Sequence, residues 1–183
     1  MAASATSKLF STEDFKIAEL LSDPPLGTAV YATPIDIPGI RKATMTPQIE
    51  SKQLRGDNRE LDNDSTLVAV EIQAEHAKIS YPALAVLLGG TWDASTGYTR
   101  LGSDYPKPFR CEWRTPPGGV DDPAGDVHFN AYKCKITAYA LGTEFEDYQI
   151  LSFTARGVYR LSDDKIWLIK PNETAAAIAT VSA

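Results

Sequence analysis

Two histidines and two cysteines are the residues with which this chain could bind a metal ion or attack a substrate. His76, His128, Cys111 and Cys134 are far apart in the sequence, and no Cys-x-x-Cys or His-x-x-x-His spacing groups them. Cys111 has no evident partner base, and no Gly-x-Ser-x-Gly motif is present, although a triad assembled from distant residues would leave no such motif. The pattern favours structural roles for all four residues.

Four short stretches look like binding motifs but lack a defining feature. The run Asp62-Asn63-Asp64 resembles the start of a calcium-binding EF-hand loop, but Leu67 stands where the loop needs its glycine. The glycine pairs at 89–90 and 118–119 lack the frames that cradle phosphate. The Arg-Gly-Asp tripeptide at 55–57 is typical of a turn. We therefore expect no enzymatic activity, no metal and no cofactor.

Acidic residues are concentrated between positions 57 and 75. They are Asp57, Glu60, Asp62, Asp64, Glu71 and Glu75. Two interpretations stay open, namely an ordinary solvated surface or a wall that faces a polyanion. Like charge would lower the residence of DNA on such a wall, so that DNA would pass without sticking.

Composition favours one globular domain that does not grip nucleic acid. The 183 residues suit a single domain, and 43% hydrophobic with 23% charged residues is ordinary for a globular protein. A net charge of -6 argues against clustered phosphate contacts. No secretory signal and no membrane span is expected, because the longest apolar run covers only residues 83–88. Two separated cysteines then indicate reduced thiols in a cytosolic setting.

The N-terminal third is predicted to hold a short helix and a long polar arm. Residues 11–22 suit a helix, because Ser11 can cap it, Phe10 and Phe15 fit a hydrophobic staple, and Asp-Pro-Pro ends it. Residues 27–33 suit a strand. Residues 41–64 are too polar for a core and too long for an ordinary connection. Their composition indicates an extended hairpin with Pro47 at an edge or bulge and a turn at 56–58.

The remainder alternates as β-strands do, around one helix. In residues 66–79, Val70 and Ile72 share one face and Glu71 and Gln73 the other, so this strand is half buried. Residues 81–88 suit a short buried helix that begins at Pro82 and ends at a glycine cap. Further strands are expected at 91–93, 98–101, 109–114, 127–140, 147–160 and 165–169. This order predicts a mainly β fold, a β-sandwich or barrel with a long extended hairpin arm and one or two short helices.

Residues 35–90 carry a resemblance to a known protein family. They read IDIPGIRKATMTPQIESKQLRGDNRELDNDSTLVAVEIQAEHAKISYPALAVLLGG. An arm with an LRGD-like turn, a long alternating strand and a short apolar helix ending in Gly-Gly are similar, in this order, to the tail tube protein (major tail protein) of long-tailed, non-contractile bacteriophages of the siphovirus type. The later strands and the small-residue C-terminus agree. The resemblance covers most of the chain and is one of pattern and order.

The resemblance implies a structural virion protein with one tail-tube domain over residues 1–183. Its β-sandwich subunits would close into hexameric rings lined by a β-barrel, and the rings would stack into a tube. The tube would assemble around a tape-measure protein in the host bacterial cytoplasm, meet tail terminator and tail-tip proteins in the virion tail, and conduct double-stranded DNA into the host. Residues 1–25 (an N-terminal arm or helix), the arm at about 38–64 and a tail at 171–183 would contact neighbouring subunits.

Two sets of residues are the candidates for these roles. The lumen candidates are Glu71, Gln73 and Glu75, which share the hydrophilic face of the long strand. The candidates for contact between rings are Arg41, Lys42, Arg55, Asp57, Arg59, Glu60, Asp62 and Asp64.

Three other functions compete with the tail tube. A secretion-system tube or ring protein would share the fold. A monomeric ligand-binding β-barrel module would use the polar arm as a lid over an apolar pocket. A β-rich enzyme without a recognisable motif is the third.

Overall fold

The computed structural model describes residues 9, 11–56, 59–116, 125–143, 149–171 and 177–178, and only the backbone at positions 56, 60 and 61. Its elements are β1 (Glu13–Ser22), β2 (Val30–Tyr31), β3 (Ile35–Asp36), β4 (Ile40–Gly56), β5 (Arg59–His76), α1 (Tyr81–Leu87), β6 (Thr91–Asp93), β7 (Gly97–Thr99), β8 (Phe109–Thr115), β9 (Val127–Ala140), β10 (Leu151–Gly157) and β11 (Trp167–Pro171). Within the described ranges the chain is mainly β with one short helix, as the sequence predicts.

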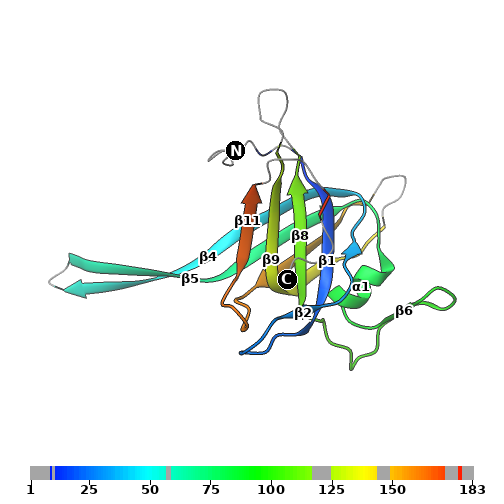
Figure 1. Cartoon of the computed structure of the whole chain (residues 1–183), viewed down its shortest axis with the longest axis horizontal. Helices are drawn as coiled ribbons and strands as arrows, with labels where there is room; N and C mark the ends of the chain where they lie inside the picture. The colour runs from blue at the N-terminus through cyan, green and yellow to red at the C-terminus, as the bar shows by residue number, and fades with distance from the viewer. Residues whose placement is uncertain are drawn as a thin grey trace.

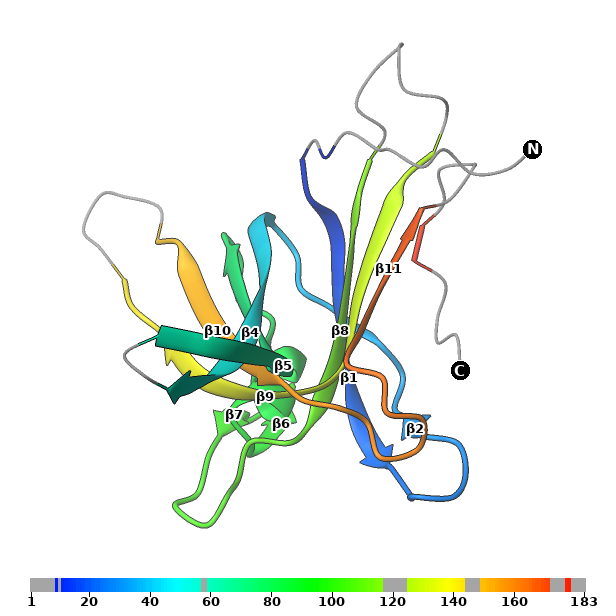
Figure 2. The same cartoon turned by 90° about the vertical axis from the view of Figure 1, so that its left-hand side faces the viewer.

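One antiparallel sheet of nine strands forms the body of the molecule (Figure 1). Its order is β2-β1-β8-β9-β10-β5-β4, with β3 paired to β1 and β11 paired to β9. A single strand, β9, joins two parts of this sheet, because its first half pairs with β8 and β11 and its second half pairs with β10. Figure 2 shows the two resulting wings, which diverge from the middle of β9.

We call β1, β8, β11 and the first half of β9 the first wing, and β4, β5, β10 and the second half of β9 the second wing. The two wings belong to one continuous sheet, whereas a β-sandwich has two separate sheets. Among the described strands, β2 and β4 end the main pairing path and do not pair with each other, so this chain by itself closes no barrel.

The hydrophobic core lies between the wings and draws on both. The ring of Phe15, from β1, stacks on Trp113 of β8 at 5.5 Å between centroids and meets the edge of Phe153, from β10, at 5.9 Å. All three side chains are buried, and Ile72 of β5 joins the same cluster. These aromatic contacts tie the first wing to the second, and burial of such large side chains supplies most of the stabilisation of the body.

The prediction of a helix at residues 11–22 is wrong, because this segment is strand β1. It pairs antiparallel with β8, and Phe15 and Ile17 alternate into the core. Ser11, which was expected to cap the helix, has a φ angle of 65°, and Asp14 has one of 54°, so both lie outside the helical region. Pairing with β8 outweighs the local helix signals, and Asp14 lies at an irregularity in the register of β1.

Several other predicted strands have different lengths in the structure. The strand expected at 27–33 is only the short β2, and the one expected at 147–160 is β10, Leu151–Gly157. The last strand begins two residues later than predicted, at Trp167. Residues 144–148, most of the N-terminal segment before residue 11 and most of the tail at 171–183 lie outside the described residues.

The helix at residues 81–88 is confirmed as α1, which packs into the core through Ala83, Leu84, Val86 and Leu87. Gly89 follows the helix with a φ of +78°, a left-handed conformation that favours glycine. A Cβ atom at this position would lie 2.6 Å from the Tyr105 carbonyl oxygen. The glycine therefore both ends the helix and lets the loop before β8 pass directly beside it.

Candidate assembly surfaces

The extended hairpin predicted at residues 41–64 is confirmed and is longer than expected. β4 has 17 residues and β5 has 18, and they stay paired from Ile40↔His76 to Gly56↔Arg59. Figure 1 shows that their far ends extend well beyond the rest of the sheet. We call residues 49–56 and 59–67 the arm.

The arm has no hydrophobic core of its own. Its described side chains are exposed on both faces, including Ile49 at 64% and Leu54 at 61% of full exposure. Ile49 also lies directly opposite Leu67, another exposed apolar residue. A two-stranded hairpin with both faces in water is at best marginally stable, so the arm is the part of the described chain that most needs a partner.

The root of the arm is a bulge on an edge strand, as Pro47 predicts. β4 is the last strand of the main path, and its register with β5 shifts between Gln48 and Ile49. Proline cannot donate a ladder hydrogen bond and is therefore tolerated at such an edge. The bulge changes the course of the strands where the second wing ends and the arm begins.

The charged candidates of the arm do not form one cluster. Lys42 belongs to the second wing, where it pairs with Glu75 at 3.5 Å, and Arg55 donates to the side chain of Gln53 at 2.9 Å. The side chains of Arg41, Arg59, Asp62 and Asp64 are exposed. Asp57 and the side chain of Glu60 lie outside the described residues. Charge on the arm is therefore distributed along both strands.

The lumen candidates Glu71, Gln73 and Glu75 share the outer face of the second wing, opposite the core residues Val70 and Ile72. Gln73 donates from Nε2 to Glu71 Oε1 at 2.8 Å. Sequence reasoning missed that this face is also basic. Arg156 of β10 lies directly across from Glu71.

The charge of this outer face is therefore mixed. Lys135 of β9 is in turn directly across from Arg156 on the side away from Glu71. Only the pairing of β5, β10 and β9 brings these cations beside the acidic row. Alternation in each strand separately indicates a polar face but not which charges become neighbours.

A stacked aromatic pair marks a second exposed surface, beside α1. The rings of Tyr81 and Trp92 lie 4.7 Å apart and nearly parallel, and both are more than a third exposed. Tyr105, in the loop before β8, is 81% exposed. Aromatic residues are enriched at the energetic centres of protein interfaces, which makes this surface a further candidate for contact with another chain.

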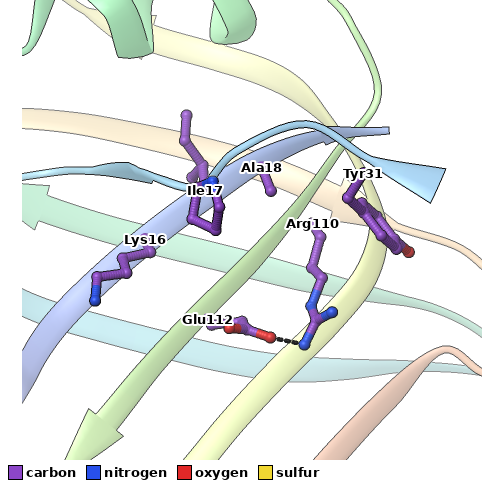
Figure 3. A pocket seen from close by; sticks show the side chains of 7 residues that line it. Lys16, Ile17, Ala18, Tyr31, Arg110 and Glu112 are labelled. Atoms are coloured by element: carbon purple, nitrogen blue, oxygen red, sulfur yellow. Dashed lines mark ion pairs between the residues drawn. The ribbon is translucent and has the colours of Figure 1, made fainter. Parts of the chain in front are cut away.

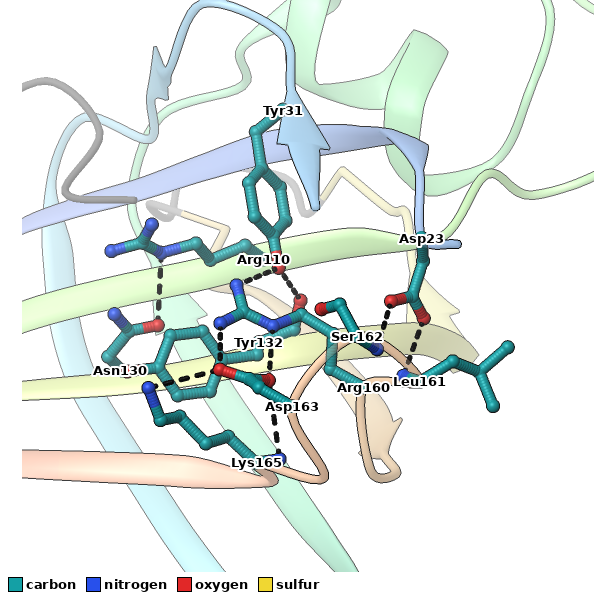
Figure 4. A network of polar contacts seen from close by, with 10 residues as sticks. All are labelled: Asp23, Tyr31, Arg110, Asn130, Tyr132, Arg160, Leu161, Ser162, Asp163 and Lys165. Atoms are coloured by element: carbon teal, nitrogen blue, oxygen red, sulfur yellow. Dashed lines mark hydrogen bonds and ion pairs between the residues drawn. The ribbon is translucent and has the colours of Figure 1, made fainter. Parts of the chain in front are cut away.

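A buried polar network joins the loops after β1 and β10 to the first wing (Figure 4). The Asp23 carboxylate accepts hydrogen bonds from Lys133 Nζ at 2.7 Å and from the backbone amides of Leu161 and Ser162 at 2.9 and 3.0 Å. Burial raises the pKa of Asp23, but these hydrogen bonds lower it more, so the net pKa lies below its usual range. Asp23 thus fixes the loop that follows β10.

Two arginines in the same region are held by aromatic rings and carboxylates. The Arg160 guanidinium lies 4.4 Å from the Tyr132 ring centroid and pairs with Asp163 at 2.5 Å. Arg110 forms an ion pair with Glu112 and lies against the ring of Tyr31 at 5.4 Å. Each buried cation therefore has its own carboxylate, and the network is a structural one.

The pocket lined by Arg110 and Glu112 is too small for an organic ligand (Figure 3). Its volume is about 10 Å³, roughly that of one water molecule. Figure 3 shows the ion pair at one side of it and Lys16, Ile17 and Ala18 of β1 along the other. Lys16 already forms an ion pair, since its Nζ lies 2.9 Å from a carboxylate oxygen of Asp14. This pocket is not a substrate site.

The residues singled out for chemistry lie apart from these surfaces. Cys111 and Cys134 are free, buried thiols 3.9 Å apart in the core, and the contact with Cys111 together with burial raises the pKa of Cys134 well above its usual range. Buried His76 contacts Lys78 O and Tyr139 Oη at 2.7 and 3.1 Å.

Across the described ranges, no cluster of three or more His, Cys, Asp or Glu side chains could hold a metal ion. No helix in the described part of the chain is long and apolar enough to cross a membrane.

Comparison with known protein families and with curated proteins finds no match to this chain.

Proposed function

We propose that this chain is a structural subunit that polymerises with copies of itself, and that it is a tail tube protein of the siphovirus type. The arm is the observation that carries the proposal. Ordering a residue costs about 1–2 kcal/mol in backbone entropy, and the arm has no core to offset that cost. A neighbouring copy would supply the missing contacts.

The edges of the sheet support the same proposal. Among the described strands, β4 presents a long unpaired edge and β11 a shorter one. Long exposed edges are templates for pairing with another chain, and closure of several copies into a ring removes them. The proposed ring is hexameric, with the outer face of the second wing as the lining of its channel and Glu71, Gln73 and Glu75 as lumen residues.

The wider assembly follows from the resemblance to tail tube proteins. Rings would stack around a tape-measure protein in the bacterial cytoplasm, terminate at tail terminator and tail-tip proteins, and conduct double-stranded DNA from the virion. The chain would have no catalytic role and no cofactor. A secretion-system tube would use the same surfaces and differ in its partners, so imaging of tubes does not separate the two.

The experiment that tests the proposal compares the full chain with a variant that lacks the arm. The structure shows that deletion of residues 42–63 would be a poor choice, because Ala43 and Met45 of that segment pack against the core. A cleaner variant replaces residues 51–65 with Asn-Gly, because Glu50 and Thr66 are paired and this dipeptide suits a two-residue hairpin turn.

We expect electron microscopy and sedimentation to find rings or tubes of the full chain, and only folded monomers of the variant. Equal free energies of unfolding for the two proteins as monomers would serve as the control. Tubes formed by the variant would contradict the role of the arm. A full chain that stays monomeric at every concentration would contradict self-assembly of the chain alone.

A further inference from the structure

A groove at one end of the second wing is lined by three cations in a protein of net charge -6. Its volume is about 420 Å³. The residues that line it are Pro108, Lys133, Lys135, Thr137, Arg156 and Val158. Lys133 already has a partner, since it binds Asp23 at 2.7 Å.

Lys135 and Arg156 are an unfavourable pair in the isolated chain. They lie directly opposite each other on neighbouring strands, and like charges in that position destabilise a sheet. No ion pair joins either of them to a carboxylate among the described residues, although Glu71 is the next residue across from Arg156. The Glu71 carboxylate instead accepts the hydrogen bond from Gln73. An external anion would relieve this repulsion.

We propose that the groove receives the arm of a second copy of this chain, with Asp62 and Asp64 as the anions. Both carboxylates are exposed, and neither forms an ion pair with a described residue. They stand two residues apart on β5, so they project from the same face about 7 Å apart. The backbones of Lys135 and Arg156 lie about 5 Å apart on neighbouring strands, and their long flexible side chains can reach two carboxylates at that spacing.

The arm cannot reach the groove of its own chain. Asp62 is nine residues before Glu71 along a continuous strand, which places it roughly 30 Å away from the groove end of the wing. The contact is therefore between copies, and it joins two different surfaces, which is the kind of interface that builds rings or filaments. This inference rests on the proposed self-assembly and names the surface that receives the arm.

Local charge complementarity also explains how acidic subunits could associate. Two copies of net charge -6 repel each other at long range, and that repulsion must be offset at the contact. The groove lies at the Arg156 end of the outer face, beside Glu71, so an arm bound there would line that end of the channel. The Gln73 and Glu75 end would stay free, because Glu75 pairs with Ser152 at the opposite end of β10 from Arg156.

A charge-swap experiment tests this inference. The groove variant is Lys135→Glu with Arg156→Glu, and the arm variant is Asp62→Lys with Asp64→Lys. A control matched to the groove variant, Lys78→Glu with Lys165→Glu, makes the same change in net charge at two exposed sites outside the groove, the arm and the unpaired strand edges. Self-association is followed by sedimentation velocity over a concentration series, and thermal unfolding checks that each variant is folded.

We expect each variant alone to weaken self-association about ten- to a hundredfold, and the control to leave it within about threefold of the wild type. An equimolar mixture of the two variants should recover assembly, because every arm then meets a groove of opposite charge. The groove assignment alone would be overturned if the wild type assembles and both variants assemble equally well. It would also be overturned if the mixture of the two variants does not recover assembly. A wild-type chain that never self-associates would overturn the proposed function as well.

The groove could also attract a polyanion, and the same variants separate the two. The wild type and the groove variant are tested for binding to a short fluorescent DNA duplex. If the groove variant loses this binding and its self-association is unchanged, the arm assignment is overturned and the groove is a nucleic-acid site.

Discussion

The second wing and the arm share two strands, β4 and β5, which are supported differently in the two regions. Where β4 and β5 lie in the wing, one face is buried, with Val70, Ile72 and Ala74 in the core. Where they continue into the arm, both faces are exposed and only the ladder between the two strands remains. The wing therefore differs from the arm in hydrophobic burial and in the additional pairing of β5 with β10.

This difference separates two properties that mutations can address independently. Substitutions in the buried core should change the free energy of unfolding, and substitutions of exposed residues in the arm should change association. A residue that affects both would show that the division is wrong.

The largest expected effect comes from the aromatic contact between the wings. Phe153→Ala removes a buried ring that meets Phe15 edge-on and stacks on Tyr139. We expect a loss of about 3–5 kcal/mol in the free energy of unfolding, measured by urea denaturation of the monomer. A loss below about 1 kcal/mol would mean that the wings are not held together by this cluster.

A smaller loss is expected from the polar network. Asp23→Asn removes the charge that Lys133 binds and one of the acceptor oxygens used by the loop after β10. At pH 7 the variant should be about 1–3 kcal/mol less stable than the wild type.

The effect of Asp23 should depend on pH in a defined direction. Its folded-state pKa is lowered, so its contribution is present above the unfolded-state pKa of about 3.9 and is lost as the pH falls through the folded-state value. The difference between the two proteins should stay constant from about pH 5 to 7 and narrow below about pH 4. A difference that instead grows in acid would contradict the network.

His76 should make the body less stable in mild acid. Burial lowers its pKa, opposed in part by the hydrogen bond to Lys78 O. Nδ1 donates to that carbonyl, so neutral Nε2 accepts from the Tyr139 hydroxyl. The unfolded chain takes up a proton near pH 6.5 and the folded chain does so only at lower pH, so stability falls as the pH drops.

The change attributable to His76 between pH 7 and pH 5 is at most about 2 kcal/mol. His76→Gln should flatten this part of the curve, whatever its absolute stability. The same slope in both proteins would assign the pH dependence to other groups.

The smallest effect on stability is expected in the arm. Leu54→Ser changes an exposed side chain, so the free energy of unfolding of the monomer should stay within about 0.5 kcal/mol of the wild type. Self-association should nevertheless weaken, because the exposed leucine is available only to a partner. Thr66→Ser, a conservative change at the inner end of the arm, is the control and should leave both the free energy of unfolding and self-association unchanged. If Leu54→Ser lowered the free energy of unfolding and left self-association unchanged, the proposed role of the arm would be contradicted.

Local patterns in the sequence were sufficient for most of the second wing and the arm. The alternation at Val70 and Ile72, Pro47 and the turn signal at 56–58 are local features of the sequence, and the hairpin that they predicted joins segments close together in the chain. The short helix and strands β8 and β9 were predictable for the same reason.

Contacts between distant segments were not predictable from local patterns. β1 carries helix-start signals, and only its pairing with β8, nearly a hundred residues away, makes it a strand. The bend at β9, the binding of Asp23 to the loop after β10, and the juxtaposition of Lys135 with Arg156 likewise depend on which strands become neighbours. No local period in the sequence encodes that choice.

Hydrogen exchange of the arm as a function of protein concentration tests the central claim most directly. The claim is that another copy orders the arm, while the body is ordered by its own core. Backbone amides of residues 49–55 and 62–67 should exchange fast at low concentration and become protected as assemblies form, with protection in β8 unchanged. Arm amides whose exchange does not depend on concentration, while assemblies form, would contradict the claim.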